Sequence, residues 1–200
     1  YGDQEEFARE ELIEKFSLEA VGRSAAAINP GKLDWLNSQY IKKIELDELI
    51  QRVQPFIEAK GYSNLDPDLL RNAVRSLKER VKTLVEMADL SEFYFCEEIA
   101  YDEKAAAKFL NQETITVLHQ AITFLLDESV LEKERVHGLI QQLAEMRAEP
   151  LVKIAQPIRV ALTGRSASPP IDEVMEVLGK EKVVKRLQRA IEYVEGHFAT

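Results

Sequence analysis

Apolar residues recur at three- and four-residue steps along most of the chain, which is the spacing of one face of an α-helix. The clearest example covers residues 46–57 and ends at Lys60-Gly61, a typical helix stop. Asp66-Pro67 then joins an N-cap side chain to a proline at the first helical position, and it predicts the start of the next helix. The same spacing predicts further helices over residues 69–77, 81–88, 105–110, 114–126, 130–146, 151–162, 171–178 and 180–195.

Alternating strand patterns are almost absent, so the sequence predicts an all-α protein. Two segments depart from the helical period. Residues 16–28 have no clean period and predict irregular structure before a helix that begins near Asn29-Pro30. The aromatic residues 93–95, followed by the acidic Glu97-Glu98, predict a turn where one helical layer docks on another, and we place a subdomain boundary there.

Prolines and glycines mark bends and ends within this pattern. Pro55 and Pro157 fall inside predicted helices, where each removes one backbone hydrogen bond and is expected to bend its helix. Gly164 and Gly179 close the helices that precede them. Ser168-Pro169-Pro170 is interpreted as a helix start, with serine as the N-cap.

The net charge of −9 argues against a protein that coats nucleic acid nonspecifically, because affinity for phosphates comes from Lys and Arg that displace counterions. The charge is uneven, however. Residues 71–86 contain five bases and two acids, and residues 150–200 contain eight bases and six acids. The sequence therefore predicts basic surface in two places, which suits a specific binder.

Motifs for catalysis or metal binding are missing. The glycines never take a phosphate-binding spacing, and one cysteine with three distant histidines gives no metal-ligand set. Cys96 is interpreted as a buried, inert thiol; the alternative is a nucleophile assisted by His119 or His137. Judged by its residues, the chain is a binder rather than a catalyst.

The lone cysteine also bears on location. It can form no internal disulfide, which fits a reducing cytosol, and no apolar run approaches the roughly 18–20 residues that a membrane span needs. We therefore expect a cytoplasmic protein. The sequence begins at Tyr1 without a methionine, and we expect it to be a piece of a longer polypeptide.

Three sets of strings carry a specific resemblance. One is Q-P-I-R-V-A-L-T-G at residues 156–164, followed by the serine and prolines at 168–170 and L-G-K-E at 178–181. A second set comprises G-D-Q-E at 2–5, F-S-L-E at 16–19 and K-L-D-W-L-N at 32–37. The third is E-R-V-K-T-L at 79–84, which lies between the first two sets. In order and spacing these strings resemble the C-terminal, anticodon-binding region of bacterial-type glutamyl-tRNA synthetases.

The resemblance implies an α-helix cage that binds the anticodon. Residues 1–44 would be the end of a stem-contact region, and residues 45–97 and 98–200 two helical subdomains. Members of the family are class I synthetases that activate glutamate with ATP and magnesium and attach it to tRNA(Glu). Their catalytic HIGH and KMSKS-type motifs do not occur here, so we expect no catalytic, cofactor or metal site in this chain. The implied partner is the tRNA(Glu) anticodon loop, and the implied parent enzyme is a cytoplasmic monomer.

The resemblance also implies which residues contact the anticodon. Arg159 lies in the longest string, and its guanidinium is expected to contact the first anticodon base or its surroundings. Ser168, Pro169 and Ile171 match positions at a helix entrance that meets the first two bases. Arg80 is the candidate for the third base.

Several alternatives stay open. Arg75 or Lys82 lies close enough in sequence to replace Arg80 in its role. Trp35 is interpreted as a core anchor, with a stacking platform for a base as the alternative, and the aromatics at 93–95 and 109 are interpreted as core. The rival function is a helical scaffold for protein partners. RNA recognition differs from it in requiring both basic segments to meet on one concave face.

Overall fold

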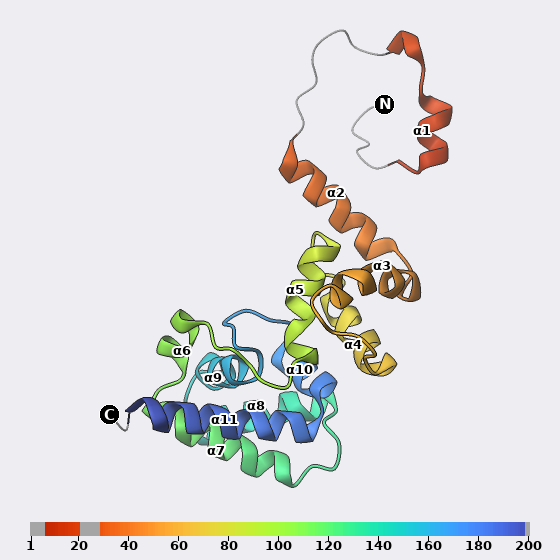
Figure 1. Ribbon diagram of the computed structural model, residues 1–200. Helices are drawn as coiled ribbons and strands as arrows, with labels where there is room; N and C mark the ends of the chain where they lie inside the picture. The colour runs from red at the N-terminus through yellow and green to blue at the C-terminus, as the bar shows by residue number, and fades with distance from the viewer. Residues whose placement is uncertain (1–6, 21–28, 199–200) are drawn as a thin grey trace.

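The computed structural model of the chain describes residues 7–20 and 29–198 (Figure 1). These residues form helices joined by loops and contain no strand, so the predicted all-α class is confirmed. The string at 2–5 and most of the predicted irregular segment, residues 21–28, lie outside the described residues. No helix among those described has the length and apolar character that a membrane span requires.

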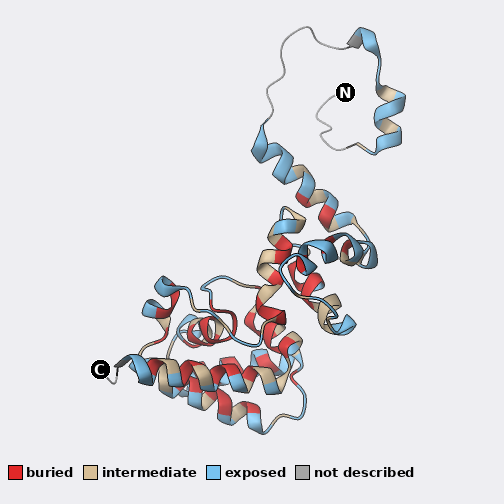
Figure 2. Cartoon of the chain, viewed as in Figure 1, coloured by how far each residue is buried: buried red, intermediate tan, exposed pale blue. Residues whose placement is uncertain are grey.

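The N-terminal elements extend away from the rest of the molecule (Figures 1 and 2). They are α1 (Arg9–Lys15), which the sequence did not predict, a 3-10 turn (Leu18–Ala20) and α2 (Pro30–Lys43). As predicted, α2 begins after Asn29, whose side chain accepts hydrogen bonds from the first-turn backbone. Trp35 on α2 is 40% exposed, so its interpretation as a core anchor is wrong.

Three helices, α3 (Leu46–Glu58), α4 (Pro67–Leu77) and α5 (Leu84–Phe95), pack on one another. The buried positions of α3 follow the predicted period, and Pro55 lies on its exposed side. The start of α5 was placed too early, because the Thr83 hydroxyl caps the helix by accepting from the Glu86 N–H. The aromatics at 93–95 form the last turn of α5, and the predicted turn lies after them, with bends at residues 97–98.

Six helices form the second group: α6 (Glu103–Phe109), α7 (Gln112–Leu126), α8 (Lys133–Met146), α9 (Leu151–Thr163), α10 (Ile171–Leu178) and α11 (Lys180–Phe198). The long helix α11 packs on α7 and α9, and α10 packs on α8. The two groups meet where α10 touches α4 and α5 touches α9. Buried residues therefore run continuously from one group into the other (Figure 2).

The cap of α4 gives a first test of how local sequence signals hold the fold. Asp66 Oδ1 accepts the Leu69 N–H at 2.8 Å, so we expect Asp66→Ala to lower the free energy of unfolding by about 1 kcal/mol. Urea denaturation followed by far-ultraviolet circular dichroism measures this loss. Asp66→Asn, which keeps an acceptor, should be nearly neutral, and an equal loss in both variants would mean that the cap is not the cause.

Candidate nucleic-acid interface

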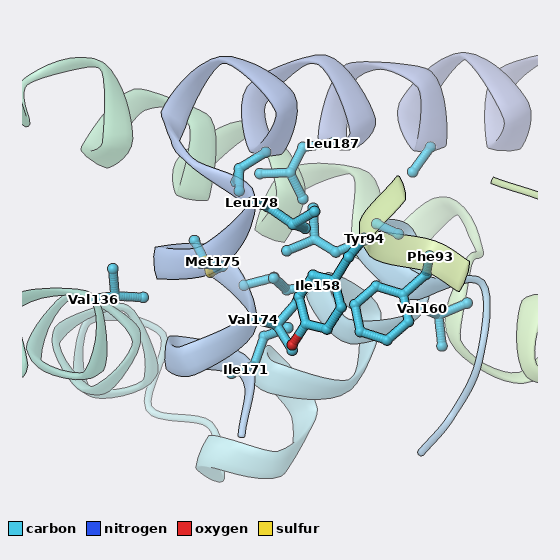
Figure 3. Close-up of a cluster of buried hydrophobic side chains, with 14 of the residues drawn as sticks. Phe93, Tyr94, Val136, Ile158, Val160, Ile171, Val174, Met175, Leu178 and Leu187 are labelled. Carbon is cyan, nitrogen blue, oxygen red and sulfur yellow. The ribbon is translucent and has the colours of Figure 1, made fainter. Parts of the chain in front are cut away.

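The end of α5 joins the two helical groups. Phe93 and Tyr94 are buried, and Figure 3 shows their rings among apolar side chains from α9, α10 and α11. The Tyr94 hydroxyl also lies 2.9 Å from the Ser76 hydroxyl of α4, and burial raises the pKa of the Tyr94 phenol. The predicted core role of the aromatic run, and its role in docking, are thus confirmed.

A buried arginine of α11 fixes the same junction. Arg186 is 2% exposed. Its Nη1 donates to the carbonyl of Leu162 near the end of α9, and its Nη2 donates to the carbonyl of Cys96 at the end of α5, each at 2.7 Å. Positive charge is favourable at helix C-termini, where carbonyl groups lack helical partners. Arg186 therefore ties the ends of two helices together.

Gly164 turns the chain out of α9 into the loop of residues 165–170. Its φ of 73° is left-handed, and its N–H donates to the Val160 carbonyl at 2.8 Å. Its own carbonyl accepts the Asp102 N–H at 2.9 Å, which ties the turn to the loop before α6. The Thr163 hydroxyl donates to the Arg159 carbonyl at 2.8 Å and accepts the Arg165 N–H at 3.3 Å. The start of the loop is consequently held both by the end of α9 and by the loop before α6.

Arg159 holds the far end of this loop. Its Nη1 donates to the Ser168 carbonyl at 3.2 Å, to the Pro169 carbonyl at 2.7 Å and to the Ser168 hydroxyl. Its Nε is buried and has no hydrogen-bond partner among the described residues. Burial lowers the pKa of Arg159, and the nearby positive charge of Arg80 lowers it further. A guanidinium that contacts a base through two nitrogens uses Nη2 together with Nη1 or Nε. Here Nη1 is occupied by the loop and Nε is buried, so only Nη2 remains for RNA in this conformation.

A small cleft opens between the α4–α5 corner and this loop. Its volume is about 190 Å³. One arginine comes from each basic segment, Arg80 from the first and Arg165 from the second, and the other lining residues are mostly apolar. The lining residues are Leu77, Arg80, Leu90, Phe93, Arg165, Ala167, Ser168 and Pro169. One arginine from each basic segment therefore lines the same concave place.

The predicted site residues are only partly brought together. Arg80, Ser168 and Pro169 line the cleft, and Arg159 lies behind its loop. Ile171 is 7% exposed and belongs to the core below (Figure 3), so it offers little surface to a base. Ser168 is not the N-cap of α10, because two prolines separate it from the helix; its hydroxyl donates to the Pro169 carbonyl at 2.7 Å instead.

Sequence reasoning missed Arg165. The only sequence signal was an arginine directly after the helix-closing Gly164, and such a position predicts exposure without predicting what the side chain faces. The structure places it in the cleft opposite the α4–α5 corner. It is the second cation of the site, alongside Arg80.

Other candidate chemistry is weak. Cys96 is half-buried, not buried as predicted, and desolvation raises the pKa of its thiol. No group of residues in the described part of the chain could hold a metal ion. A larger groove of about 840 Å³ lies between α6, α7 and α9. Its three bases, Lys108, Arg147 and Lys153, accompany two acids, Glu113 and Glu149, and Arg147 pairs with Glu149 at 2.9 Å. Its acids offset most of its positive charge, whereas the cleft with Arg80 and Arg165 has no acid in its lining, so the larger groove has less attraction for a phosphate backbone.

The cleft suits unpaired nucleotides, since sites that bind them combine arginine with flat surfaces for the bases. Comparison with known proteins makes this specific. Residues 48–191 match the family described as "Anticodon binding domain", and the chain belongs to this family.

The relatives agree with the resemblance found in the sequence. The chain is 45% identical over its whole length to "Glutamate--tRNA ligase 1" of Syntrophus aciditrophicus and 42% identical over 98% of its length to "Glutamate--tRNA ligase" of Syntrophobacter fumaroxidans. It spans 42% of the length of each. The predicted resemblance to glutamyl-tRNA synthetases is therefore confirmed.

The fold is also similar to a solved structure, a glutamate tRNA ligase from Elizabethkingia meningosepticum. The TM-score is 0.82, and the match covers 92% of this chain and 36% of that one. At 24% identity, this likeness supports the fold alone.

Proposed function

We propose that this chain is the part of a glutamate–tRNA ligase that binds the anticodon loop of tRNA(Glu). The observation that carries the proposal is the cleft in which Arg80 and Arg165, from the two basic segments, face an apolar floor. Unpaired loop bases offer both faces and edges to such a surface. The names of the relatives support glutamate and its tRNA as the substrates.

The remaining catalytic chemistry would belong to the rest of the parent enzyme. That enzyme would use ATP with magnesium to activate glutamate and would act in the cytoplasm as a monomer. Within this chain, residues 1–44 would complete a stem-contact region, and residues 45–97 and 98–200 would form the two anticodon-binding subdomains.

A titration of the 200-residue chain with tRNA(Glu) and with an unrelated tRNA, at two salt concentrations, tests the proposal. We expect tighter binding of tRNA(Glu) at both salt concentrations, because contacts with bases persist where phosphate contacts weaken. Equal affinity for the two tRNAs, or no measurable binding, would remove the proposal and favour a scaffold for protein partners.

Arg159 and Arg80 should respond differently to alanine. Arg159→Ala is expected to weaken tRNA(Glu) binding by about 1–3 kcal/mol and also to lower the free energy of unfolding by about 1–3 kcal/mol, because it frees residues 168 and 169. Arg80→Ala, which removes an exposed side chain, should weaken binding with little change in unfolding. Isothermal titration calorimetry and urea denaturation measure the two quantities. Unchanged stability in Arg159→Ala would contradict its role in holding the loop.

A further inference from the structure

Arg165 combines a fixed backbone with an unengaged guanidinium. Among the described residues its hydrogen bonds are those of its backbone with the Thr163 hydroxyl, and its side chain is exposed. The adjoining Gly164 is held by Val160 and Asp102. The backbone of Arg165 is thus held in place while its guanidinium stays available to a ligand. The Nη1 of Arg159, in contrast, is occupied by hydrogen bonds to the loop.

Within the part of the chain that the structure describes, the surroundings of Arg165 also leave its charge without a carboxylate partner. It lies on the border of two clefts that share Phe93, the one with Arg80 and a second of about 180 Å³. Two carboxylates line the second cleft, and both have other partners. Glu92 lies 3.7 Å from the Lys60 ammonium and accepts the Tyr62 hydroxyl at 3.3 Å, and Glu98 pairs with Arg189 at 2.7 Å.

We propose that Arg165 contacts an unpaired anticodon base that lies on the apolar floor of the cleft. Arg159 positions the protein loop of residues 165–170, which carries Arg165. The floor favours a base over a phosphate, because Leu77, Leu90 and Phe93 offer a phosphate no hydrogen bond, whereas a base can cover them with its face. A guanidinium at the rim can stack on that base or donate to its edge. The inference rests on the proposed function and assigns the direct contact to a residue outside the family strings.

The test is a double substitution in protein and RNA. The 200-residue chain and its Arg165→Ala variant are titrated with the anticodon stem-loop of tRNA(Glu) and with three versions that are abasic at one anticodon position each. We expect Arg165→Ala to weaken binding of the intact RNA roughly tenfold, and to have almost no further effect on one of the abasic RNAs. Arg165→Lys should lose most of the same affinity, because it keeps the charge and lacks the planar group.

Three controls distinguish a base contact from a general loss of charge or of folding. Arg135→Ala on α8 removes a positive charge outside the cleft and should leave binding nearly unchanged. Thermal unfolding of Arg165→Ala should match that of the unsubstituted chain. The loss caused by Arg159→Ala should shrink in an Arg159→Ala, Arg165→Ala double variant if the first residue acts through the second.

Three results would overturn the inference. An equal loss on all three abasic RNAs, with a salt slope smaller by about 0.7, would identify a phosphate contact instead. No loss in Arg165→Ala, with tRNA(Glu) still preferred by the unsubstituted chain, would remove Arg165 and leave the proposed function intact. No preference for tRNA(Glu) in the unsubstituted chain would overturn both.

Discussion

Gly164→Ala is expected to lower the free energy of unfolding by about 2–5 kcal/mol. Two costs add at this position. A φ of 73° costs an alanine about 1–2 kcal/mol, because its Cβ then crowds the backbone. An added Cβ would also overlap the Ala100 carbonyl oxygen, and since that atom belongs to the backbone, the two segments would have to separate.

Gly61→Ala is the matched control. Gly61 has a φ of 92°, but an added Cβ there would meet no atom within 4 Å, so only the conformational cost remains. Urea denaturation of both variants should show a loss of about 1 kcal/mol for Gly61→Ala and a clearly larger one for Gly164→Ala. Equal losses would mean that residues 100 and 164 can move apart freely. Gly164→Ala should also weaken tRNA(Glu) binding, because it displaces the turn that carries Arg165.

The contrast between these glycines shows which parts of the fold were visible in the sequence. Gly164 was recognised as the end of a helix, because a helix stop is a local signal. Its contact with Ala100 comes from a distant segment and leaves no local pattern. The helices of residues 46–58 and 171–178 were predicted well for the same reason, since their apolar period lies within them and their end signals directly follow.

The candidate site likewise has features that the sequence predicted and features that depend on tertiary contacts. Family strings pointed to Arg159 and Ser168, but they did not reveal that the Arg159 guanidinium is turned toward its own loop. The resemblance placed Ile171 at a surface that meets the anticodon, and tertiary packing buries this side chain instead. Arg165 and Arg80 line one cleft because α5 packs on α9 and α10 packs on α4, and no single segment encodes these contacts.

Arg186→Met should cause a second large loss of stability, about 3 kcal/mol. Hydrogen bonds from a charged group contribute about 1.5–3 kcal/mol each, and this substitution removes two of them. Part of this loss of stability is offset, because the substitution also removes the cost of burying a charged guanidinium. The Nε of that guanidinium has no partner in the described part of the chain. The loss prevails because the Leu162 and Cys96 carbonyls both lose their charged donor at helix ends.

Arg189→Ala provides the comparison, because Arg189 lies one turn further along α11 and its pair with Glu98 is exposed. Exposed pairs contribute about 0–1 kcal/mol, so urea denaturation should separate the two variants clearly. Arg186 lies outside the cleft, yet it ties the end of α5 to the end of α9, and these two ends carry Phe93 and the loop of Arg165. We therefore expect Arg186→Met to weaken tRNA(Glu) binding even at temperatures where the chain stays folded. Unchanged affinity in a destabilised Arg186→Met variant would show that the cleft keeps its shape without this arginine.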